Sequence, residues 1–483
     1  MTLPVINIAS ILPAIVLALF GIAIMVIDPF VERGTKLKLG WFGFAGVLAA
    51  LVALAPMSGQ SGAWYADIWL VDDYTIFFHV VFLLIAAITI LMSIEFLGRE
   101  QAPPSEFYSL ILFATSGMLL MSGAGELMMV FIGLEILSIA TYILAGYRRG
   151  DLKSNEASLK YFLLGSFASA FFLYGVALIF GATGSTNLSE IATAVRSGVP
   201  QAELVYASAA LMLTALGFKV AMAPFHIWTP DVYEGAPTPV TGFMSAGPKA
   251  AGFAVLLRIF LTAFPDIQDR WILVIWVAAA LTMVIGNVVA VAQTNIKRML
   301  AYSSIAHAGY VAVAFAAGSG RGVTAAMFYL LAYSIMNLGA FAVVTILSRK
   351  EDRLVELNDY KGLARRRPGL AALLSLFLLS LAGIPGTAGF AGKFFIFRSA
   401  VESGLIWLTI LGLLTTVVSF YYYLNVIVQM YMREPTEEFS DLDIAPGLGA
   451  ALIVTAILTL YLGILPTRVL DWATDSALGV LIR

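Results

Sequence analysis

Lysines inside apolar stretches are the residues of this sequence best suited to do chemistry. Lys160, Lys219, Lys249 and Lys393 each lie in a run that is apolar enough for a membrane helix. A lysine near the middle of a bilayer costs about 2.5–3.5 kcal/mol on insertion scales, so such residues mark ion and proton pathways. Burial and a nearby carboxylate act on a lysine in opposite directions, and a lysine held between them can bind and release a proton. These residues therefore predict a buried proton-transfer site.

Glu135 supplies an acid at a similar depth. It lies about ten residues into its apolar run, which is roughly 15 Å at 1.5 Å per residue, and Ser138 and Tyr142 follow on the same helical face. Carboxylates inside a membrane are functional by default. We therefore expect Glu135 to pair with a lysine of the sixth or seventh apolar run. A protonated, hydrogen-bonded structural glutamate is the alternative.

Lys219 is the strongest single candidate because it precedes a helix break. Pro224 follows five residues later inside the same apolar run, and proline interrupts helical hydrogen bonding. A broken helix is tolerated in a membrane only against other protein or a wet cavity. His226 comes shortly after the proline, which is expected to rotate it away from Lys219. His226 has two possible roles: a proton relay, or a buried core histidine whose hydrogen bonds are all made.

Other polar positions are accessory candidates. His307 and Tyr310 share a helical face with Ser303, which places a titratable group in the middle of a polar stripe. Lys160 lies near the start of its run, where it either snorkels to the interface or pairs with Glu156 one turn earlier. A single stripe is as well explained by contacts between helices. Several stripes together indicate a hydrated interior.

The composition defines the class of protein. Apolar residues make up 60% of the 483 residues and charged residues 12%, with a mean hydropathy of +0.92, whereas soluble domains have roughly 25% charged residues. This predicts an all-α polytopic membrane protein. The net charge of −2 gives no indication of a nucleic-acid partner. Without cysteine, and with three histidines that lack metal-ligand spacing, we expect no metal site and no cofactor bound by this chain.

About fourteen apolar runs are long enough to cross a bilayer. The first is expected to be a retained span and not a signal peptide, because no basic leader or cleavage signal accompanies it. Arg258, near the outer end of the eighth span, is expected to snorkel to the interface, and residues 468–482 to form a short interfacial helix. Lys and Arg concentrate in alternate loops, which predicts both chain ends outside the cytoplasm. The predicted spans are residues 5–27, 39–56, 74–97, 107–123, 125–147, 156–181, 204–228, 238–262, 271–293, 299–318, 323–347, 369–397, 404–432 and 447–466.

The order of the spans predicts two inverted repeats. Spans 4–8 and 9–13 form two groups of five, and an odd number of crossings inverts the second group relative to the first. The fourth member of each group carries a lysine and helix-breaking residues: Lys219 in the seventh span, and Lys393 with an expected unwound segment around it in the twelfth. The predicted units are an N-terminal three-helix segment (1–106), two five-helix repeats (107–262 and 263–432), and a C-terminal helix with its tail (433–483).

Three stretches carry a resemblance to a known family. They are residues 218–240 (FKVAMAPFHIWTPDVYEGAPTPV), residues 295–310 (NIKRMLAYSSIAHAGY), and the triplets GIP and GKF at 383–385 and 392–394. In these stretches, in span number and in charge bias, the chain resembles the antiporter-like subunits of the bacterial proton-pumping NADH:quinone oxidoreductase (respiratory complex I). The VYEGAP continuation at 232–237 and the lysine at 393 are similar to the subunit N family within that group.

The resemblance implies a function for the chain. The implied function is proton translocation coupled to NADH oxidation and quinone reduction, with NADH, FMN, iron–sulfur clusters and quinone bound by other subunits. The implied partners are other membrane subunits of complex I, including a neighbouring antiporter-like subunit and small membrane subunits, together with lipids of the bacterial inner membrane. The implied proton-transfer residues are Glu135, Lys219, Lys249 and Lys393, with Lys160, His226, His307 and Tyr310 as accessory positions. In this hypothesis protons enter by way of Lys219 and Lys249 and leave by way of Lys393.

Two other functions are compatible with the same residues. A sodium/proton antiporter subunit of shared ancestry is one alternative, and sodium-dependent transport by the isolated chain would favour it. A purely structural membrane subunit is the other, and full activity after loss of both Lys219 and Lys249 would favour that.

Overall fold

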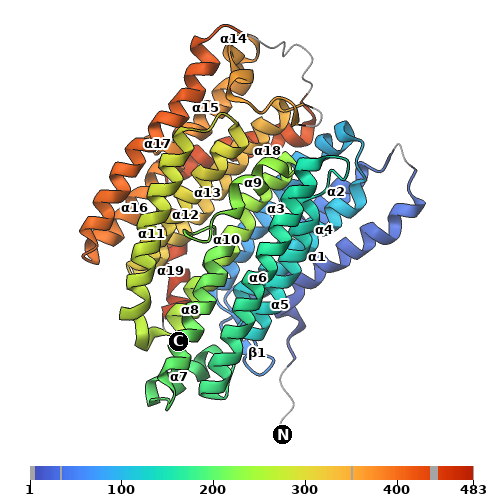
Figure 1. Cartoon of the computed structure of the whole chain (residues 1–483). Coiled ribbons are helices and arrows are strands. Elements are labelled where there is room, and N and C mark those ends of the chain that lie inside the picture. Colours follow the sequence, from blue (N-terminus) through green and yellow to red (C-terminus); the bar gives the residue numbers. More distant parts are fainter. Residues whose placement is uncertain (1–5, 33–34, 350–351, 436–443, 482–483) are drawn as a thin grey trace.

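A computed structural model describes residues 6–32, 35–349, 352–435 and 444–481 of the chain. Long helices run nearly side by side through its whole height (Figure 1). Among these residues, 13 helices are long and apolar enough to cross a membrane. Two shorter helices, α15 and α16, follow one another and make a further crossing, so the predicted all-α membrane fold is confirmed. The predictions about the two chain ends fall on residues 1–5 and 482–483, which lie outside the described residues.

The membrane-crossing helices follow the predicted order. Short 3-10 helices, a small helix α14 (Leu363–Arg366) and a two-stranded hairpin, β1 (Gly62–Trp64) with β2 (Trp69–Val71), lie between them. The crossing helices are α1 (Ile8–Ile27), α2 (Lys38–Val52), α3 (Asp73–Glu100), α4 (Pro104–Gly123), α5 (Leu127–Ala145), α6 (Leu152–Thr183), α8 (Ala202–Lys219) with α9 (Trp228–Gly235), α10 (Thr238–Thr262), α11 (Gln268–Val291), α12 (Ile296–Ala316), α13 (Gly320–Leu347), α15 (Pro368–Ala382) with α16 (Ala388–Glu402), α17 (Ile406–Met432) and α18 (Pro446–Ile464).

The centre of the bundle is formed by helices from both predicted repeats. α10, α12 and α13 are almost wholly buried, whereas α6, α11 and α17 keep wide exposed faces. Figure 1 shows the buried helices between the blue-green first half and the orange-red second half. The packing of α10 on α13 and of α9 on α12 joins the two halves. Helices apolar on all sides belong in such a core, so the polar groups they carry must find partners inside the protein.

The seventh crossing is interrupted directly after Lys219. α8 ends at Lys219 and α9 begins at Trp228, so the prediction of a broken helix is right, but the break starts earlier than Pro224. The physical reason is that proline lacks an N–H and its ring clashes with the carbonyl four residues before it, which is that of Val220. A side chain satisfies one carbonyl near the break: the indole N–H of Trp228 donates to the carbonyl of Phe218 at 3.0 Å.

The twelfth crossing is interrupted between Ala382 and Ala388. Gly383 has φ of 97°, a left-handed conformation that suits glycine at the end of a helix. The N–H of Ile384 donates to the carbonyl of Leu379 and the N–H of Gly383 to that of Ser380, both at 3.0 Å, as in a Schellman motif. The expected unwound segment at Lys393 is therefore wrong in position, since Lys393 lies inside helix α16. The breaking residues are those that precede α16.

Arg258 does not snorkel, which corrects the prediction made from its place in the span. Its side chain is 2% exposed and makes two hydrogen bonds of 2.9 Å to the carboxylate of Asp72, just before α3. Burial raises the pKa of Asp72, but the charge and hydrogen bonds of Arg258 outweigh that effect, and the pKa lies below its usual value. The predicted C-terminal helix is present as α19 (Thr467–Leu481), which packs on α3 and α13.

Candidate functional site

Lys219 and Glu135 lie near each other but form no direct ion pair. The ammonium of Lys219 donates to the hydroxyl of Ser138 at 2.9 Å and to that of Tyr161 at 3.5 Å. Glu135 accepts a short hydrogen bond from the hydroxyl of Ser169 on α6. Glu135 and Ser138 are one turn apart on α5, so the acid and the amine contact neighbouring positions of one helix face. The predicted pairing is thus replaced here by three hydroxyl contacts, two to Lys219 and one to Glu135.

Aromatic rings enclose the end of α8 where Lys219 lies. The rings of Tyr161 and Trp228 are stacked at 4.4 Å with an interplanar angle of 6°, which holds α9 against α6. The ammonium of Lys219 lies 5.6 Å from the ring centre of Tyr161 and 6.0 Å from that of Tyr142. A cation over aromatic faces is stabilised without a counter-charge, so the amine can be buried beside an acid that it does not touch.

Lys249 lies deeper in the core, on α10. Its ammonium donates to the backbone carbonyl of Ser304 on α12 at 2.5 Å and to the hydroxyl of the same residue. Gly252, one turn further along α10, has no side chain, and a Cβ there would lie 3.6 Å from Cγ of Lys219. This close approach brings the helix that carries Lys249 against the end of α8 that carries Lys219.

His307 connects several tyrosines in the middle of the bundle. Its Nδ1 is 2.5 Å from the hydroxyl of Tyr329, and its Nε2 is 3.1 Å from that of Tyr423. Ser303 shares a short hydrogen bond with Tyr423. The ring of Tyr333 lies 5.0 Å from the imidazole and 5.6 Å from the ammonium of Lys249. The predicted polar stripe on α12 therefore exists and reaches from Lys249 toward the second broken helix.

Lys393 ends this series of contacts. Its ammonium donates to the carbonyls of Leu381 and Ala382 at 3.0 and 3.1 Å, which are free because α15 stops there. It also lies 4.7 Å above the ring of Tyr310, whose hydroxyl accepts from Asn287 at 3.1 Å. Backbone carbonyls at a helix break are a recurring way to hold a cation in membrane transporters.

The structure thus brings most of the predicted residues into one region. Lys219, Lys249 and Lys393 are 5%, 2% and 4% exposed, and none forms an ion pair within the described part of the chain. From Lys249 to Lys393 the groups follow one another through aromatic rings: the ring of Tyr333 lies between Lys249 and His307, and the ring of Tyr310 lies between His307 and Lys393. Such a series can carry protons by short transfers between neighbouring groups or intervening waters.

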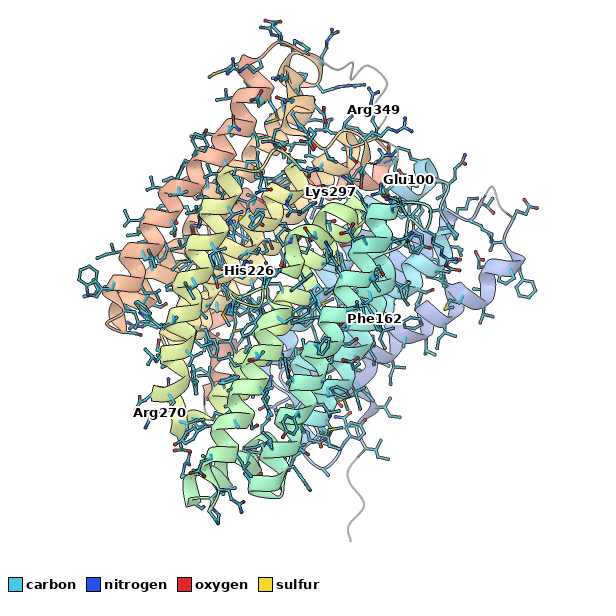
Figure 2. The ribbon with its side chains drawn as sticks, viewed as in Figure 1. Glu100, Phe162, His226, Arg270, Lys297 and Arg349 are labelled. Carbon is cyan, nitrogen blue, oxygen red and sulfur yellow. The ribbon has the colours of Figure 1, made fainter. Side chains whose placement is uncertain are left out.

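His226 and Lys160 lie away from this line. His226 is half-buried in the interrupted segment, its Nδ1 has no hydrogen-bond partner, and it sits on the side of the bundle seen in Figure 2. Lys160 pairs with Glu156 at 2.6 Å, as one prediction held, and with Asp231 of α9 at 2.7 Å. Asp231 also accepts from Arg298 of α12 at 2.7 Å, so this network joins α6, α9 and α12.

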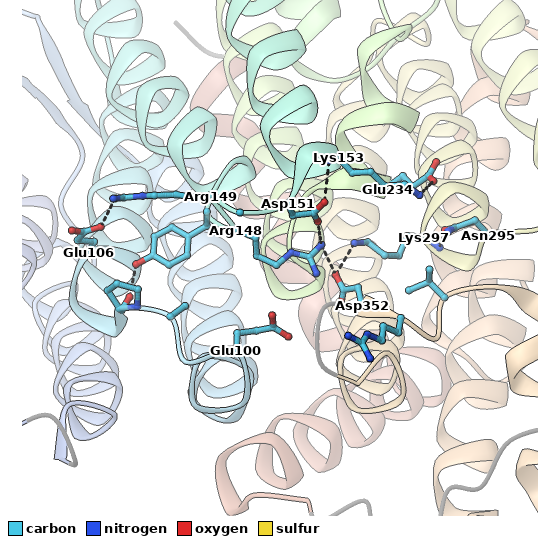
Figure 3. Close-up of a pocket in the computed structure, with 16 residues that line it drawn as sticks. Glu100, Glu106, Arg148, Arg149, Asp151, Lys153, Glu234, Asn295, Lys297 and Asp352 are labelled. Carbon is cyan, nitrogen blue, oxygen red and sulfur yellow. Dashed lines mark hydrogen bonds and ion pairs between the residues drawn. The ribbon is translucent and has the colours of Figure 1, made fainter.

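A charged cavity opens at the end of the bundle where α5 connects to α6 (Figure 3). Its volume is about 770 Å³. At its base the carboxylate of Asp352 contacts Lys297 at 3.0 Å, Arg148 at 3.3 Å and the hydroxyl of Thr238 at 2.8 Å. Burial raises the pKa of Asp352, but the charges of Lys297 and Arg148 outweigh it and hold this pKa below its usual value. One carboxylate therefore ties the starts of α10 and α12 to the loop between α5 and α6.

Several contact residues escaped the sequence prediction. Ser304 is the direct neighbour of Ser303, which the helical stripe favoured, and a stripe alone does not show which of two adjacent residues faces a partner helix. Asp231 lies inside a stretch that carries the resemblance, but the sequence prediction gave it no role. Ser169 had no signal beyond being a hydroxyl in an apolar span.

With this geometry described, comparisons with known proteins define the class and the family. The family model for the NADH:quinone oxidoreductase/Mrp antiporter transmembrane region matches residues 124–419. The chain is 51% identical over 467 residues to "NADH-quinone oxidoreductase subunit N 1" of Solibacter usitatus, with 96% of each chain covered. It is 47% identical to "NADH-quinone oxidoreductase subunit N" of Trichlorobacter lovleyi, with 98% of this chain and 97% of that one covered.

Solved structures agree with these relatives. A chain of respiratory complex I from Thermus thermophilus with bound aureothin is 38% identical with a TM-score of 0.81, and the match covers 96% of this chain and 100% of that one. A chain of the Mrp complex from Dietzia shares the fold with a TM-score of 0.85 at 22% identity. The class is therefore that of the antiporter-like, multi-pass membrane proteins. The chain belongs to the NADH-quinone oxidoreductase subunit N family.

Proposed function

We propose that this chain is a membrane subunit of NADH:quinone oxidoreductase and carries protons across the membrane along the line Lys219, Lys249, His307 and Lys393. The observation that carries the proposal is the set of three buried amines without ion pairs among the described residues, with His307 and tyrosine rings lying between Lys249 and Lys393. Uncompensated amines in such a core are costly. A structural role does not require them at three separate depths, whereas proton transfer requires a group at each step.

In this proposal the Glu135–Lys219 pair is the switch. Two unit charges 4 Å apart interact by about 4 kcal/mol at an effective dielectric of 20. Forming the pair therefore favours a charged Lys219, and separating the pair favours release of its proton toward Lys249. Protons then pass through His307 and its tyrosines to Lys393 and leave on the opposite side. The energy for the switch comes from neighbouring subunits.

The remaining parts of the assembly belong to other chains in this proposal. The described residues contain no group of three or more His, Asp or Glu side chains placed to hold a metal. NADH, FMN, iron–sulfur clusters and quinone are assigned to other subunits of the complex. The chain lies in the bacterial inner membrane with both ends on the periplasmic side, so that the cavity at Asp352 faces the cytoplasm and supplies protons.

A sodium/proton antiporter subunit is the second candidate, favoured by the fold shared with the Mrp complex. The relatives named subunit N support it less, because their identity to this chain is 51% and 47% against 22% for the Mrp chain. Replacement of sodium by potassium in a transport assay separates the two functions, since only the antiporter loses activity.

The experiment that tests the proposal is the Lys219→Ala variant in the assembled complex. We expect proton pumping, measured as protons moved per electron in sealed vesicles, to be abolished. The exposed Lys38, at the start of α2, provides the matched control Lys38→Ala, which should pump normally. A normal proton-to-electron ratio in an assembled Lys219→Ala complex would overturn the role of Lys219.

A further inference from the structure

The contact between Ser169 and Glu135 is a feature that the proposed pathway does not use. Ser169 lies on α6 and its hydroxyl donates a short hydrogen bond to Oε1 of Glu135. This is the hydrogen bond that the structure gives to the Glu135 carboxylate. A hydroxyl donor stabilises an ionised carboxylate, and hydrogen bonds to charged groups are stronger than those between neutral groups.

The position of this contact decides where Glu135 points. α5 and α6 run in opposite directions and pack together, so Ser169 lies opposite Glu135 while Tyr161, two turns nearer the start of α6, lies beside Lys219. Ser169 and Lys219 therefore compete for the carboxylate of Glu135, and they approach it from different positions along the α5–α6 pair. In the structure Ser169 holds it, and Lys219 contacts the hydroxyl of Ser138 instead.

Resting on the proposed function, we propose that Ser169 is a positioning residue: it holds Glu135 away from Lys219, and Glu135 exchanges this hydroxyl for the Lys219 ammonium during proton transfer. Ser138 is the matching partner that occupies Lys219 while the pair is open. The open arrangement, with Glu135 bonded to Ser169, and the closed arrangement, with Glu135 paired to Lys219, then have similar free energies. The reason is that a charge-assisted hydrogen bond and a partly screened ion pair are of comparable strength. A switch needs this balance, since a pair that always closes transfers nothing.

Helix α6 also offers a matched control. Ser166 lies one turn before Ser169, is exposed on the outer face of α6, and donates to the carbonyl of Phe162 on its own helix at 2.8 Å. Ser166→Ala therefore removes a hydroxyl at nearly the same depth without touching Glu135. Ser169→Thr keeps a hydroxyl at the proposed position and should restore the wild-type behaviour that Ser169→Ala loses.

The test uses the assembled complex in sealed vesicles, with protons moved per electron as the first readout. Ser169→Ala should favour the closed Glu135–Lys219 pair on the order of tenfold or more, since that is the usual effect of a charge-assisted hydrogen bond. The proton-to-electron ratio should fall in Ser169→Ala and remain normal in Ser166→Ala and Ser169→Thr. Ser169→Cys, which has a weaker donor of similar size, serves the same purpose where Ser169→Ala does not assemble.

A second readout separates positioning from mere packing. The infrared band of the Glu135 carboxyl group, identified by its absence in Glu135→Gln, should shift in Ser169→Ala and not in Ser166→Ala. An unshifted band, or normal pumping by Ser169→Ala when Lys219→Ala is inactive, overturns the role of Ser169 and leaves the proposed function standing. Normal pumping by Lys219→Ala overturns the proposed function itself, whatever Ser169→Ala does.

Discussion

The two broken helices of this chain hold their lysines in different ways. Lys219 ends the first half of its broken helix and contacts hydroxyl groups of other helices, α5 and α6. Lys393 lies in the second half of its broken helix and contacts the carbonyls that its own first half leaves free. Side-chain hydroxyls can rotate and exchange partners, whereas carbonyls at a helix end are fixed. The first break is thus built to change its contacts and the second to keep them.

The acid near Lys219 sharpens this difference. Glu135 lies one turn from the serine that Lys219 contacts, while no carboxylate forms an ion pair with Lys393 in the described part of the chain. We infer that the first repeat contains the switch and the second repeat a relay with a constant environment. The following predictions compare the two breaks.

The largest expected effect is on proton pumping by Glu135→Gln and Lys393→Ala. Lys393→Ala removes a step of the pathway, so pumping in sealed vesicles should fall more than tenfold at any imposed voltage. Glu135→Gln removes an interaction of about 4 kcal/mol at contact but leaves every amine in place, so proton leak driven by voltage should persist. Equal loss of pumping and of leak in both variants would contradict the division into switch and relay.

The next effect concerns the glycine that ends α15. Gly383→Ala forces a side chain into φ of 97° and should cost about 1–3 kcal/mol, with a Cβ 3.3 Å from Cδ of Lys393. Gly369→Ala is the control, because no atom lies within 4 Å of the added Cβ. Thermal unfolding of the purified chain in detergent should separate the two variants. Equal midpoints would show that the second break is not rigid.

A comparable but smaller effect is expected at the first break. The backbone N–H of Ala223 donates to the hydroxyl of Thr282 on α11 at 2.8 Å, and Thr282→Val leaves that buried donor unpaired at a cost of about 1–3 kcal/mol. The partly exposed Thr214, whose hydroxyl bonds to its own helix, gives the control Thr214→Val. If the backbone at the first break can rearrange, the unpaired N–H finds another partner and part of this cost is avoided. Thr282→Val should therefore lower the unfolding temperature less than Gly383→Ala does.

The smallest effect is a pH dependence at α9, the second half of the first break. Burial raises the pKa of Asp231, but hydrogen bonds from Lys160 and Arg298 outweigh it and the pKa lies below the ordinary value of 3.8. A lowered pKa stabilises the folded chain above pH 3.8, and this stabilisation is lost as the pH falls through the folded value. For this partly exposed group the contribution is about 0.2–1 kcal/mol.

The measurement is the difference in unfolding temperature between the wild type and Asp231→Asn as the pH is lowered from about 6. The variant should unfold earlier at the higher pH, and the difference should begin to shrink near the ordinary value of 3.8 and vanish once the pH lies below the folded pKa. Taking the difference removes the contributions of Asp72 and Asp352, whose pKa values are lowered as well. A difference that stays constant across this range would mean that Asp231 does not hold α9.

The sequence predicts the membrane-crossing helices well because apolar length is a property of each segment alone. It also predicts which helices break, since glycine and proline act locally at Gly383 and Pro224. It does not predict the partners of buried groups, because these depend on packing between distant helices. Arg258 illustrates the limit. Its partner Asp72 lies 186 residues away, so from the sequence alone the arginine is predicted to lie near the membrane interface. Ser169 is missed for the same reason.

The roles of the buried residues and the division of the chain into units stay predictions. The structure places Glu135, Lys219, Lys249, His307 and Lys393 in one region, and their roles in proton transfer are tested by the variants above. The orientation of the chain in the membrane likewise rests on the distribution of Lys and Arg in the loops.

The most direct measurement is a structure of the assembled complex at a resolution that shows ordered waters. We expect waters to join the side chains of Glu135, Lys219, Lys249, His307 and Lys393 into one connected line. A dry, apolar barrier between Lys249 and Lys393 would contradict the proton pathway.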